Sequence, residues 1–203
     1  MPGRLFLTRD VGELAAIAGV DAPETNLPRR NIQPGQEILT LTLEGFQHMR
    51  WGMIPSGRKN ARGRPVMETI INARSETVFD KTAFDDMRRA VVPVDGWYEW
   101  TGAKGRKTAW AITTKDGRPL WFAAIYDVWN GPGGVSVPQV ATLTCPPNRD
   151  VRDIHDRMGV LLSPEDIKLW LTGDPDVARS LFRPWPDGRL SVSEAKDVDW
   201  SQP

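Results

Sequence analysis

The sequence has few of the residues that build disulfides and metal sites. Its 203 residues include one cysteine, Cys145, and two histidines, His48 and His155. A lone cysteine excludes an intramolecular disulfide and a zinc site built on paired thiolates. Two histidines also argue against an all-histidine metal site. We therefore expect no metal and no cofactor, and we expect the protein to work in a reducing, cytoplasmic compartment.

Long apolar runs and an excess of charge are also missing. No apolar run approaches the roughly 18 residues of a membrane span, and the N-terminus has no apolar stretch long enough for a secretory signal. We expect no contact with a membrane. The 26 basic side chains balance the 26 acidic ones. This balance argues against binding nucleic acid by bulk attraction alone, although a local basic groove would be compatible with it.

Glycine, proline and tryptophan are plentiful, with 18, 17 and 9 copies. Such a composition favours many short elements joined by tight turns. The patterns predict one α+β domain over residues 1–203 with a mostly antiparallel sheet. Strands are expected at 38–43, 46–53, 90–94, 97–100, 108–113, 119–126 and 135–144, and helices at 11–18 and 83–89 and after 163 and 174. We expect loop at 21–36, and loop with one strand after 184.

Asn72 and Arg74 lie two residues apart in the segment Ile70–Thr77. If this segment is extended, both side chains share one face. An amide beside a guanidinium suits an anionic ligand with a neighbouring carbonyl or hydroxyl group. The alternative is a turn asparagine followed by a surface arginine.

Glu99 lies between Tyr98 and Trp100 in a segment with the pattern of a strand. In a strand it faces away from both aromatic neighbours. Poor solvation would raise the pKa of its carboxyl group and make it a general acid or base near neutral pH. The alternative is an exposed glutamate on the solvent face of a sheet.

His155 and Cys145 are the remaining candidates for chemistry. The ordinary pKa of histidine lies close to neutral, so His155 in Ile154–Met158 is a candidate acid or base. A structural role is the alternative, and it is the role that we expect for His48. Cys145 ends a predicted strand, and we expect it to be buried and inert.

Residues 55–65 form a polar loop with four basic residues and no acidic one. They are Arg58, Lys59, Arg62 and Arg64. The loop either holds phosphate groups or is an ordinary solvated surface.

Six segments resemble, in order, the motifs of the SRAP family, the SOS-response-associated peptidases or abasic-site-processing proteins. They lie between residues 2 and about 165, and residues 166–203 form C-terminal helices and a tail. The segments are Met1–Arg4, Asn31–Pro34, Trp51–Pro55, Ile71–Thr77, Arg88–Trp100 and Ile154–Gly159.

The resemblance implies a compact α+β fold around a barrel-like sheet with short peripheral helices. It also implies a monomer associated with the nucleoid. The implied partner is single-stranded DNA with abasic sites, and DNA junctions are a further partner. In the family, an N-terminal cysteine forms a thiazolidine with the aldehyde of the ring-opened sugar. By resemblance, Asn72 contacts that sugar, Glu99 acts as acid and base, and His155 assists Schiff-base chemistry. The expected DNA-binding residues are Gly3, Arg4, Pro34, Arg58, Arg62, Arg74 and Thr144.

Position 2 departs from the family, because Pro2 stands where the family has cysteine. A thiazolidine needs an amine and a thiol on one residue, so proline cannot form one. Removal of Met1 would expose a secondary amine, which can condense with an aldehyde to an iminium ion. A base, either Glu99 or His155, could then drive β-elimination of the 3′ phosphate. If Met1 stays, Pro2 has no free amine.

Three functions remain open from the sequence. The first is an abasic-site lyase that uses Pro2, Asn72, Glu99 and His155. The second is a non-catalytic protein that binds single-stranded or damaged DNA and has lost its nucleophile. The third is the autopeptidase, or hydrolase, activity that the family name suggests. In a minor variant, Cys145 replaces the missing thiol in space.

Overall fold

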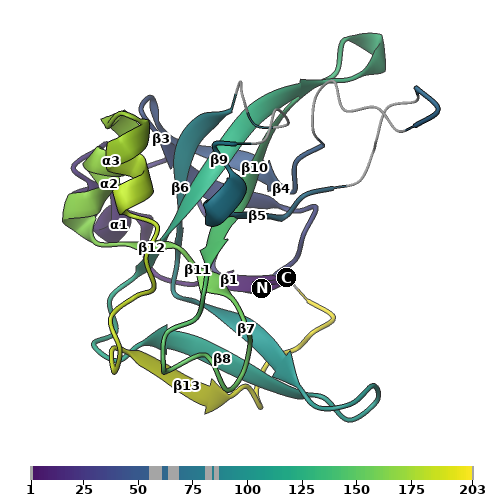
Figure 1. Ribbon diagram of the computed structural model, residues 1–203, viewed down its shortest axis with the longest axis vertical. Helices are drawn as coiled ribbons and strands as arrows, with labels where there is room; N and C mark the ends of the chain where they lie inside the picture. The colour runs from purple at the N-terminus through teal and green to yellow at the C-terminus, as the bar shows by residue number, and fades with distance from the viewer. Residues whose placement is uncertain (1, 55–60, 64–68, 81–83, 85–86, 203) are drawn as a thin grey trace.

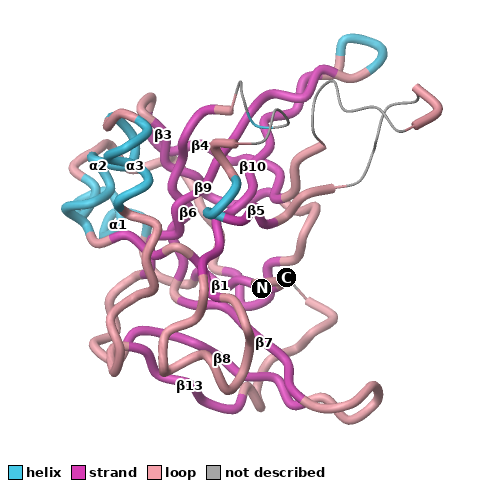
Figure 2. The backbone as a smooth tube through the Cα atoms, viewed as in Figure 1, coloured by secondary structure: helices cyan, strands magenta, loops and turns pink. Residues whose placement is uncertain are grey.

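Short strands dominate the fold, as the glycine and proline content predicts. The computed structural model describes residues 2–54, 61–63, 69–80, 84 and 87–202. Two sheets lie one above the other in Figure 1, and three helices gather beside the upper sheet. The backbone tube in Figure 2 shows how much of the remaining chain consists of loops.

The smaller sheet carries the start of the chain. Its strands pair antiparallel in the order β13-β8-β7-β1-β2. Their bounds are Leu190–Glu194 (β13), Thr108–Thr114 (β8), Gly96–Thr101 (β7), Arg4–Leu7 (β1) and Arg29–Ile32 (β2). The predicted strands at 97–100 and 108–113 therefore form one hairpin of this sheet.

The larger sheet has the order β11-β10-β4-β3-β6-β9-β12, and β5 pairs with β10. Its strands are Glu37–Thr42 (β3), Gly45–Trp51 (β4), Asn72–Arg74 (β5), Arg88–Val94 (β6), Leu120–Asn130 (β9), Ser136–Cys145 (β10), Met158–Gly159 (β11) and Leu161–Leu162 (β12). Most pairs are antiparallel, but β10 runs parallel to β4 and β5. Because β10 also pairs with β9, the sheet curls back on itself. The α+β prediction is confirmed, with two sheets rather than one closed barrel.

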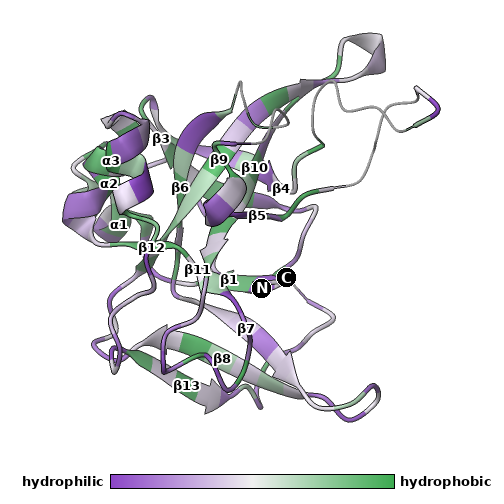
Figure 3. Cartoon of the chain, viewed as in Figure 1, coloured by the Kyte–Doolittle hydropathy of each residue, from purple (hydrophilic) through white to green (hydrophobic). Residues whose placement is uncertain are grey.

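The core lies between the sheets and around the curled one. Trp97 of β7 meets Phe122 of β9 edge to face, with ring centroids 5.6 Å apart. Both side chains are fully buried. Figure 3 shows the hydrophobic colouring along the centres of β9 and β10. This contact holds β7, and with it the start of the chain, against the larger sheet.

The three helices begin where the capping residues predict, and the first also ends where Gly19 predicts. Their bounds are Val11–Ala18 (α1), Pro164–Thr172 (α2) and Pro175–Ser180 (α3). Asp10, Ser163 and Asp174 accept hydrogen bonds from the first-turn amides of these helices. The structure also describes the 3₁₀ turns Ser75–Thr77 (η1) and Pro132–Gly134 (η3). None of the helices in the described ranges is long and apolar enough to cross a membrane.

Several elements differ from the sequence predictions. The expected loop at 21–36 contains β2, because Ile32 pairs with Leu5 across the smaller sheet. In the expected helix at 83–89, residues 88 and 89 instead begin β6, where Arg88 stacks its guanidinium over the Tyr126 ring at 4.4 Å. The rest of that segment lies largely outside the described residues. Glu13 pairs with Arg9 rather than completing a capping box.

Candidate active site

Asn72 joins the two sheets at the start of the chain. It lies on β5, beside Thr142 of the parallel strand β10. Its Nδ2 donates to the backbone oxygen of Pro2 at 2.8 Å, and its Oδ1 accepts from the Thr142 hydroxyl. Pro2 is buried. The amide therefore fixes the backbone of residue 2, and the predicted extended conformation of the Asn72 segment is confirmed.

Glu99 lies next to the chain start on the inner face of the smaller sheet. Strands β1 and β7 pair Arg4 with Tyr98, and the same register one step further sets Gly3 opposite Glu99. Glu99 is 4% exposed, so the alternative of a solvent-facing glutamate is wrong. Burial raises the pKa of its carboxyl group, with Asp156 adding to the rise and Trp97 opposing it. Such a carboxyl group can take up and return a proton near neutral pH.

His155 lies in the loop between β10 and β11. The backbone N–H of Arg157 donates to its Nδ1 at 3.0 Å, and an oxygen of Asp156 lies 2.8 Å from the same nitrogen. A neutral ring that accepts at Nδ1 carries its proton on Nε2. Burial lowers the pKa of His155, which favours this neutral form. The charge of Asp156 also raises the pKa of Glu99.

An ion pair clamps the loop of His155 to the larger sheet. Arg157 binds both carboxylate oxygens of Glu76 in η1, and it also donates to the backbone oxygen of Thr144 at 2.6 Å. This pairing lowers the pKa of Glu76 to about 2. The sequence reasoning gave Glu76 and Arg157 no role. The signal that could have found them is that one motif contains an acidic residue and another a basic residue that can pair with it.

Arg4 lies on the opposite face of the smaller sheet from Glu99, because neighbouring strand residues point to opposite sides. Its Nε donates to Oδ1 of the buried Asn31 at 3.0 Å. Asn31 in turn donates to the backbone oxygens of Trp200 and Gln202. The Trp200 ring packs against Tyr98 with centroids 5.0 Å apart. The C-terminal tail thus holds the first strand from outside the sheet.

Comparison with known proteins identifies the family. The description of the matching family is SOS response associated peptidase (SRAP), and the match covers residues 1–198. The chain belongs to this family. The resemblance of the six motifs is therefore confirmed.

Two relatives of this SRAP protein have names that state an activity. The chain is 33% identical over 199 residues to the abasic site processing protein YoqW of Bacillus subtilis, covering 91% of this chain and 88% of the relative. It is 30% identical over 154 residues to the abasic site processing protein HMCES of Mus musculus, covering 61% of this chain and 44% of the relative.

Solved structures support the fold. A protein from Bacteroides thetaiotaomicron has a TM-score of 0.81 at 21% identity, covering 96% of this chain and 92% of its own. A phage-related protein from Bordetella bronchiseptica has a TM-score of 0.72 at 28% identity, covering 96% of this chain and 94% of its own.

The remaining predicted DNA contacts of the SRAP protein are spread around the site. Arg74 is exposed at the end of β5, and Gly3 and Pro34 are partly buried. Arg62 is exposed, whereas Arg58 lies outside the described residues. The contact of each of these residues with DNA stays a prediction.

Thr144 has no exposed surface. Its hydroxyl lies within hydrogen-bond distance of Ala73 and Arg157, so it supports the clamp of the His155 loop. Its predicted contact with DNA stays a prediction.

Cys145 and His48 occupy structural positions. Cys145 is fully buried at the end of β10, and burial raises the pKa of its thiol to about 12. A thiol with this pKa stays protonated at neutral pH and is a poor nucleophile. His48 lies on the exposed face of β4 and contacts Asn26 at 3.2 Å. Within the described part of the chain, no three His, Cys, Asp or Glu side chains gather as metal ligands.

Proposed function

We propose that this SRAP protein processes abasic sites in single-stranded DNA, and that the amine of Pro2 is its nucleophile. The names of its relatives support the substrate. The hydrogen bond from Asn72 to the backbone oxygen of Pro2 is the observation that carries the chemistry. It fixes residue 2 beside a buried carboxyl group, and residue 2 is the position at which the family has its reactive cysteine.

The proposed reaction begins when the Pro2 nitrogen, freed by removal of Met1, attacks C1′ of the ring-opened sugar. A C–N bond forms, water leaves, and a cationic iminium ion results. The positive charge acidifies C2′, from which a base removes a proton. The C3′–O bond then breaks and the 3′ phosphate leaves with the electron pair. Water hydrolyses the iminium and returns the free amine.

Glu99 is the better candidate for the base in this reaction. The lone pair of His155 at Nδ1 accepts the N–H of Arg157, so it is already engaged in a hydrogen bond. Nε2 of the neutral ring carries a proton and can donate a hydrogen bond to the substrate. The raised pKa of Glu99 suits transfer of a proton near neutral pH. Asn72 supplies an amide that holds the chain start and is polar enough to contact the sugar.

One experiment tests this proposal directly. Intact mass first establishes whether Met1 has been removed. The protein is then incubated with an abasic single-stranded oligonucleotide, with and without borohydride, which reduces an iminium to a stable amine. We expect a trapped adduct with borohydride and strand cleavage without it. The variant Cys145→Ser is the control and should behave like the wild type.

The variant Pro2→Cys tests whether the family's own reaction can be restored. Its N-terminal residue has both an amine and a thiol, so it should form a stable thiazolidine cross-link that needs no borohydride. We expect turnover to fall as the cross-link accumulates.

Failure of both tests, with the abasic oligonucleotide still bound, would favour the non-catalytic DNA-binding function. Release of peptide from the N-terminus, without DNA, would favour the autopeptidase.

A further inference from the structure

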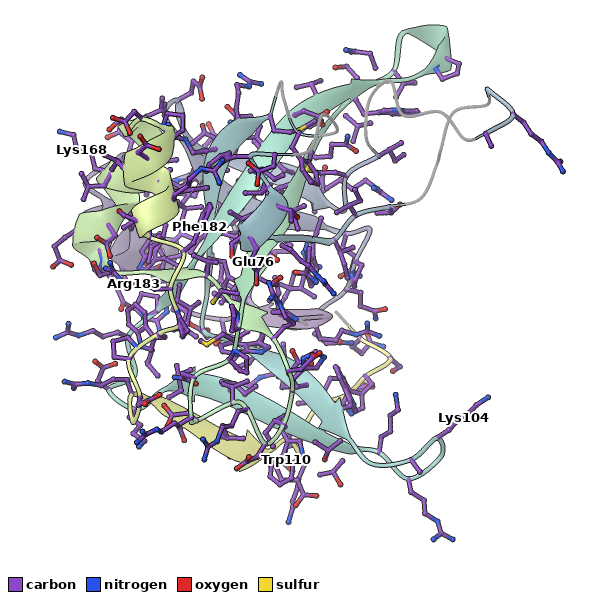
Figure 4. The ribbon with its side chains drawn as sticks, viewed as in Figure 1. Glu76, Lys104, Trp110, Lys168, Phe182 and Arg183 are labelled. Carbon is purple, nitrogen blue, oxygen red and sulfur yellow. The ribbon has the colours of Figure 1, made fainter. Side chains whose placement is uncertain are left out.

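The hairpin between β7 and β8 carries a group of basic residues that lies outside the six motifs. Residues 102–107, here called the basic arm, contain Lys104, Arg106 and Lys107 and no acidic residue. All six residues are exposed. Figure 4 shows Lys104 pointing away from the protein at the end of this hairpin.

The basic arm is a defined hairpin and not an irregular loop. Strands β7 and β8 stay paired up to Thr101 and Thr108, and the Arg106 N–H donates to the Ala103 oxygen at 2.9 Å. Gly102 has a φ of 98°, and a Cβ added there would lie 2.5 Å from the Arg106 oxygen. This tight turn therefore requires glycine.

Aromatic side chains brace the base of the arm. The Trp110 indole N–H donates to the Thr101 hydroxyl at 2.8 Å. The rings of Trp100 and Trp200 pack with centroids 5.3 Å apart. These contacts fix the direction in which the paired strands carry the basic residues away from the sheet.

The charges of the arm lack acidic partners in the part of the chain that the structure describes. Arginines elsewhere form ion pairs, such as Arg9 with Asp95 and Arg157 with Glu76. Within the described ranges, no acidic side chain forms an ion pair with Lys104, Arg106 or Lys107. Three neighbouring cations without counter-charges create a local positive potential that attracts a polyanion.

The same strand connects the arm to the candidate active site. Glu99 lies on β7 five residues before Lys104. Extended backbone spans about 3.3 Å per residue, and the chain turns after Thr101, so the two residues lie at most about 17 Å apart. A stacked DNA strand advances about 3.4 Å per nucleotide, so this upper limit corresponds to about five nucleotides. The helices lie on the far side of the molecule from the arm (Figure 1).

We propose that the basic arm binds backbone phosphates of the DNA within about five nucleotides of the reacting sugar, on one side of the lesion. This inference rests on the proposed function, because it takes DNA as the ligand. The arm adds affinity and orients the strand, and it does not touch the reacting atoms.

The test compares a double variant, Lys104→Ser with Arg106→Ser, with a control that removes the same charge elsewhere. The control is Lys168→Ser with Arg183→Ser, at the helical end of the molecule (Figure 4).

Dissociation constants for an abasic single strand with long flanks are measured over a range of salt concentrations. Each lost phosphate contact lowers the slope of log affinity against log salt by about 0.7. We expect the arm variant to bind on the order of tenfold more weakly at low salt, with a slope smaller by about 1.4. The control should match the wild type.

Flank length locates the contact. With about two nucleotides on each side of the lesion, the arm variant should bind like the wild type, because the strand is too short to reach the arm. Extending the flank on one side of the lesion to about eight nucleotides should restore the difference in affinity between the arm variant and the wild type. Extending the flank on the other side should not.

An unchanged slope on the long oligonucleotide would overturn the proposal. An equal loss in the control would also overturn it, because bulk charge would then explain the effect, as would a loss already present with short flanks. If the wild type binds no DNA at all, the proposed function fails together with the arm. Circular dichroism of each variant checks that it is folded.

Discussion

The candidate active site and the helical end of the molecule are built in opposite ways. At the site, polar side chains are buried between strands, with Glu99 and Thr142 at 4% and 0% exposure. At the helical end, Trp170 is fully buried and packs with Phe79 and Phe182 at centroid distances of 6.4 and 5.8 Å. Exposed helix caps, such as Asp10 and Asp174, supply polar groups at that end.

The difference separates stability from chemistry. Burial of apolar rings lowers the free energy of the folded state, whereas burial of a carboxyl group raises it and shifts the pKa. We therefore expect substitutions at the helical end to change unfolding and leave the reaction intact. Substitutions at the site should change the reaction, or the titration of the site, more than the overall stability.

The largest effect is expected for Trp170→Ala. This change leaves a cavity under α2 and removes the hydrogen bond from the indole N–H to the Ala90 oxygen, 2.7 Å long. We expect the free energy of unfolding to fall by about 3–5 kcal/mol in urea titrations. The borohydride-trapped fraction per folded molecule should not change. A loss of trapping with little loss of stability would contradict the separation of stability at the helical end from chemistry at the site.

Glu99→Gln is expected to act on the reaction. Strand cleavage should fall by about 10²–10⁴-fold, as for loss of a general base, while the affinity for the abasic oligonucleotide stays the same. Single-turnover cleavage and fluorescence anisotropy measure the two quantities. If cleavage persists unchanged, the role of base passes to His155.

Glu99→Gln also changes the pH dependence of stability. Because the pKa of Glu99 is raised in the folded state, its favourable contribution is complete below the unfolded pKa and is lost as pH rises through the folded pKa. Glutamine does not ionise, so the variant should gain stability relative to the wild type as pH rises from 4 to 8. Thermal melts across this range would show the gain, and a constant difference would argue against a buried, shifted carboxyl group.

Glu76→Gln is expected to have a smaller effect. The pKa of Glu76 is about 2 in the folded state. Its ion pair with Arg157 therefore stabilises the protein fully when the pH is above the ordinary pKa of glutamate, and this stabilisation is lost as the pH falls toward 2. Since Glu76 is 44% exposed, solvent screening limits the loss at pH 7 to about 1 kcal/mol. Urea titrations at pH 7 and pH 3 should show the difference shrinking. A difference that grows toward low pH would contradict this assignment.

The smallest effect is a shift in the titration of His155. Burial lowers its pKa from the ordinary 6.5, so its ring signals in an NMR titration should have a midpoint below that value. His155→Gln identifies the signals. A midpoint above 6.5 would mean that Asp156 outweighs burial and that the ring is charged near neutral pH.

Local sequence signals predicted much of the fold. Caps such as Asp10 and Ser163 marked the helix starts, and alternation of apolar residues marked the strand that begins near Ile38. Strand β2 was missed because its pairing partner, β1, is distant in the sequence. Strands β11 and β12 have two residues each, too few for any periodic pattern.

The candidate site was only partly predictable. Alternation correctly set Glu99 apart from Tyr98 and Trp100, but it could not decide which face was buried. Burial follows from the packing of Trp97 on Phe122, which is a contact between distant segments. The hydrogen bond from Asn72 to Pro2 spans 70 residues and has no local signal.

The central claim is that the amine of residue 2 reacts with the abasic aldehyde. The most direct measurement is borohydride trapping with an abasic oligonucleotide, followed by proteolysis and mass spectrometry of the modified peptide. We predict that the reduced adduct lies on the nitrogen of Pro2 in protein that has lost Met1. An adduct on a lysine, or no adduct on protein with a free Pro2 amine that still binds the oligonucleotide, would contradict the account.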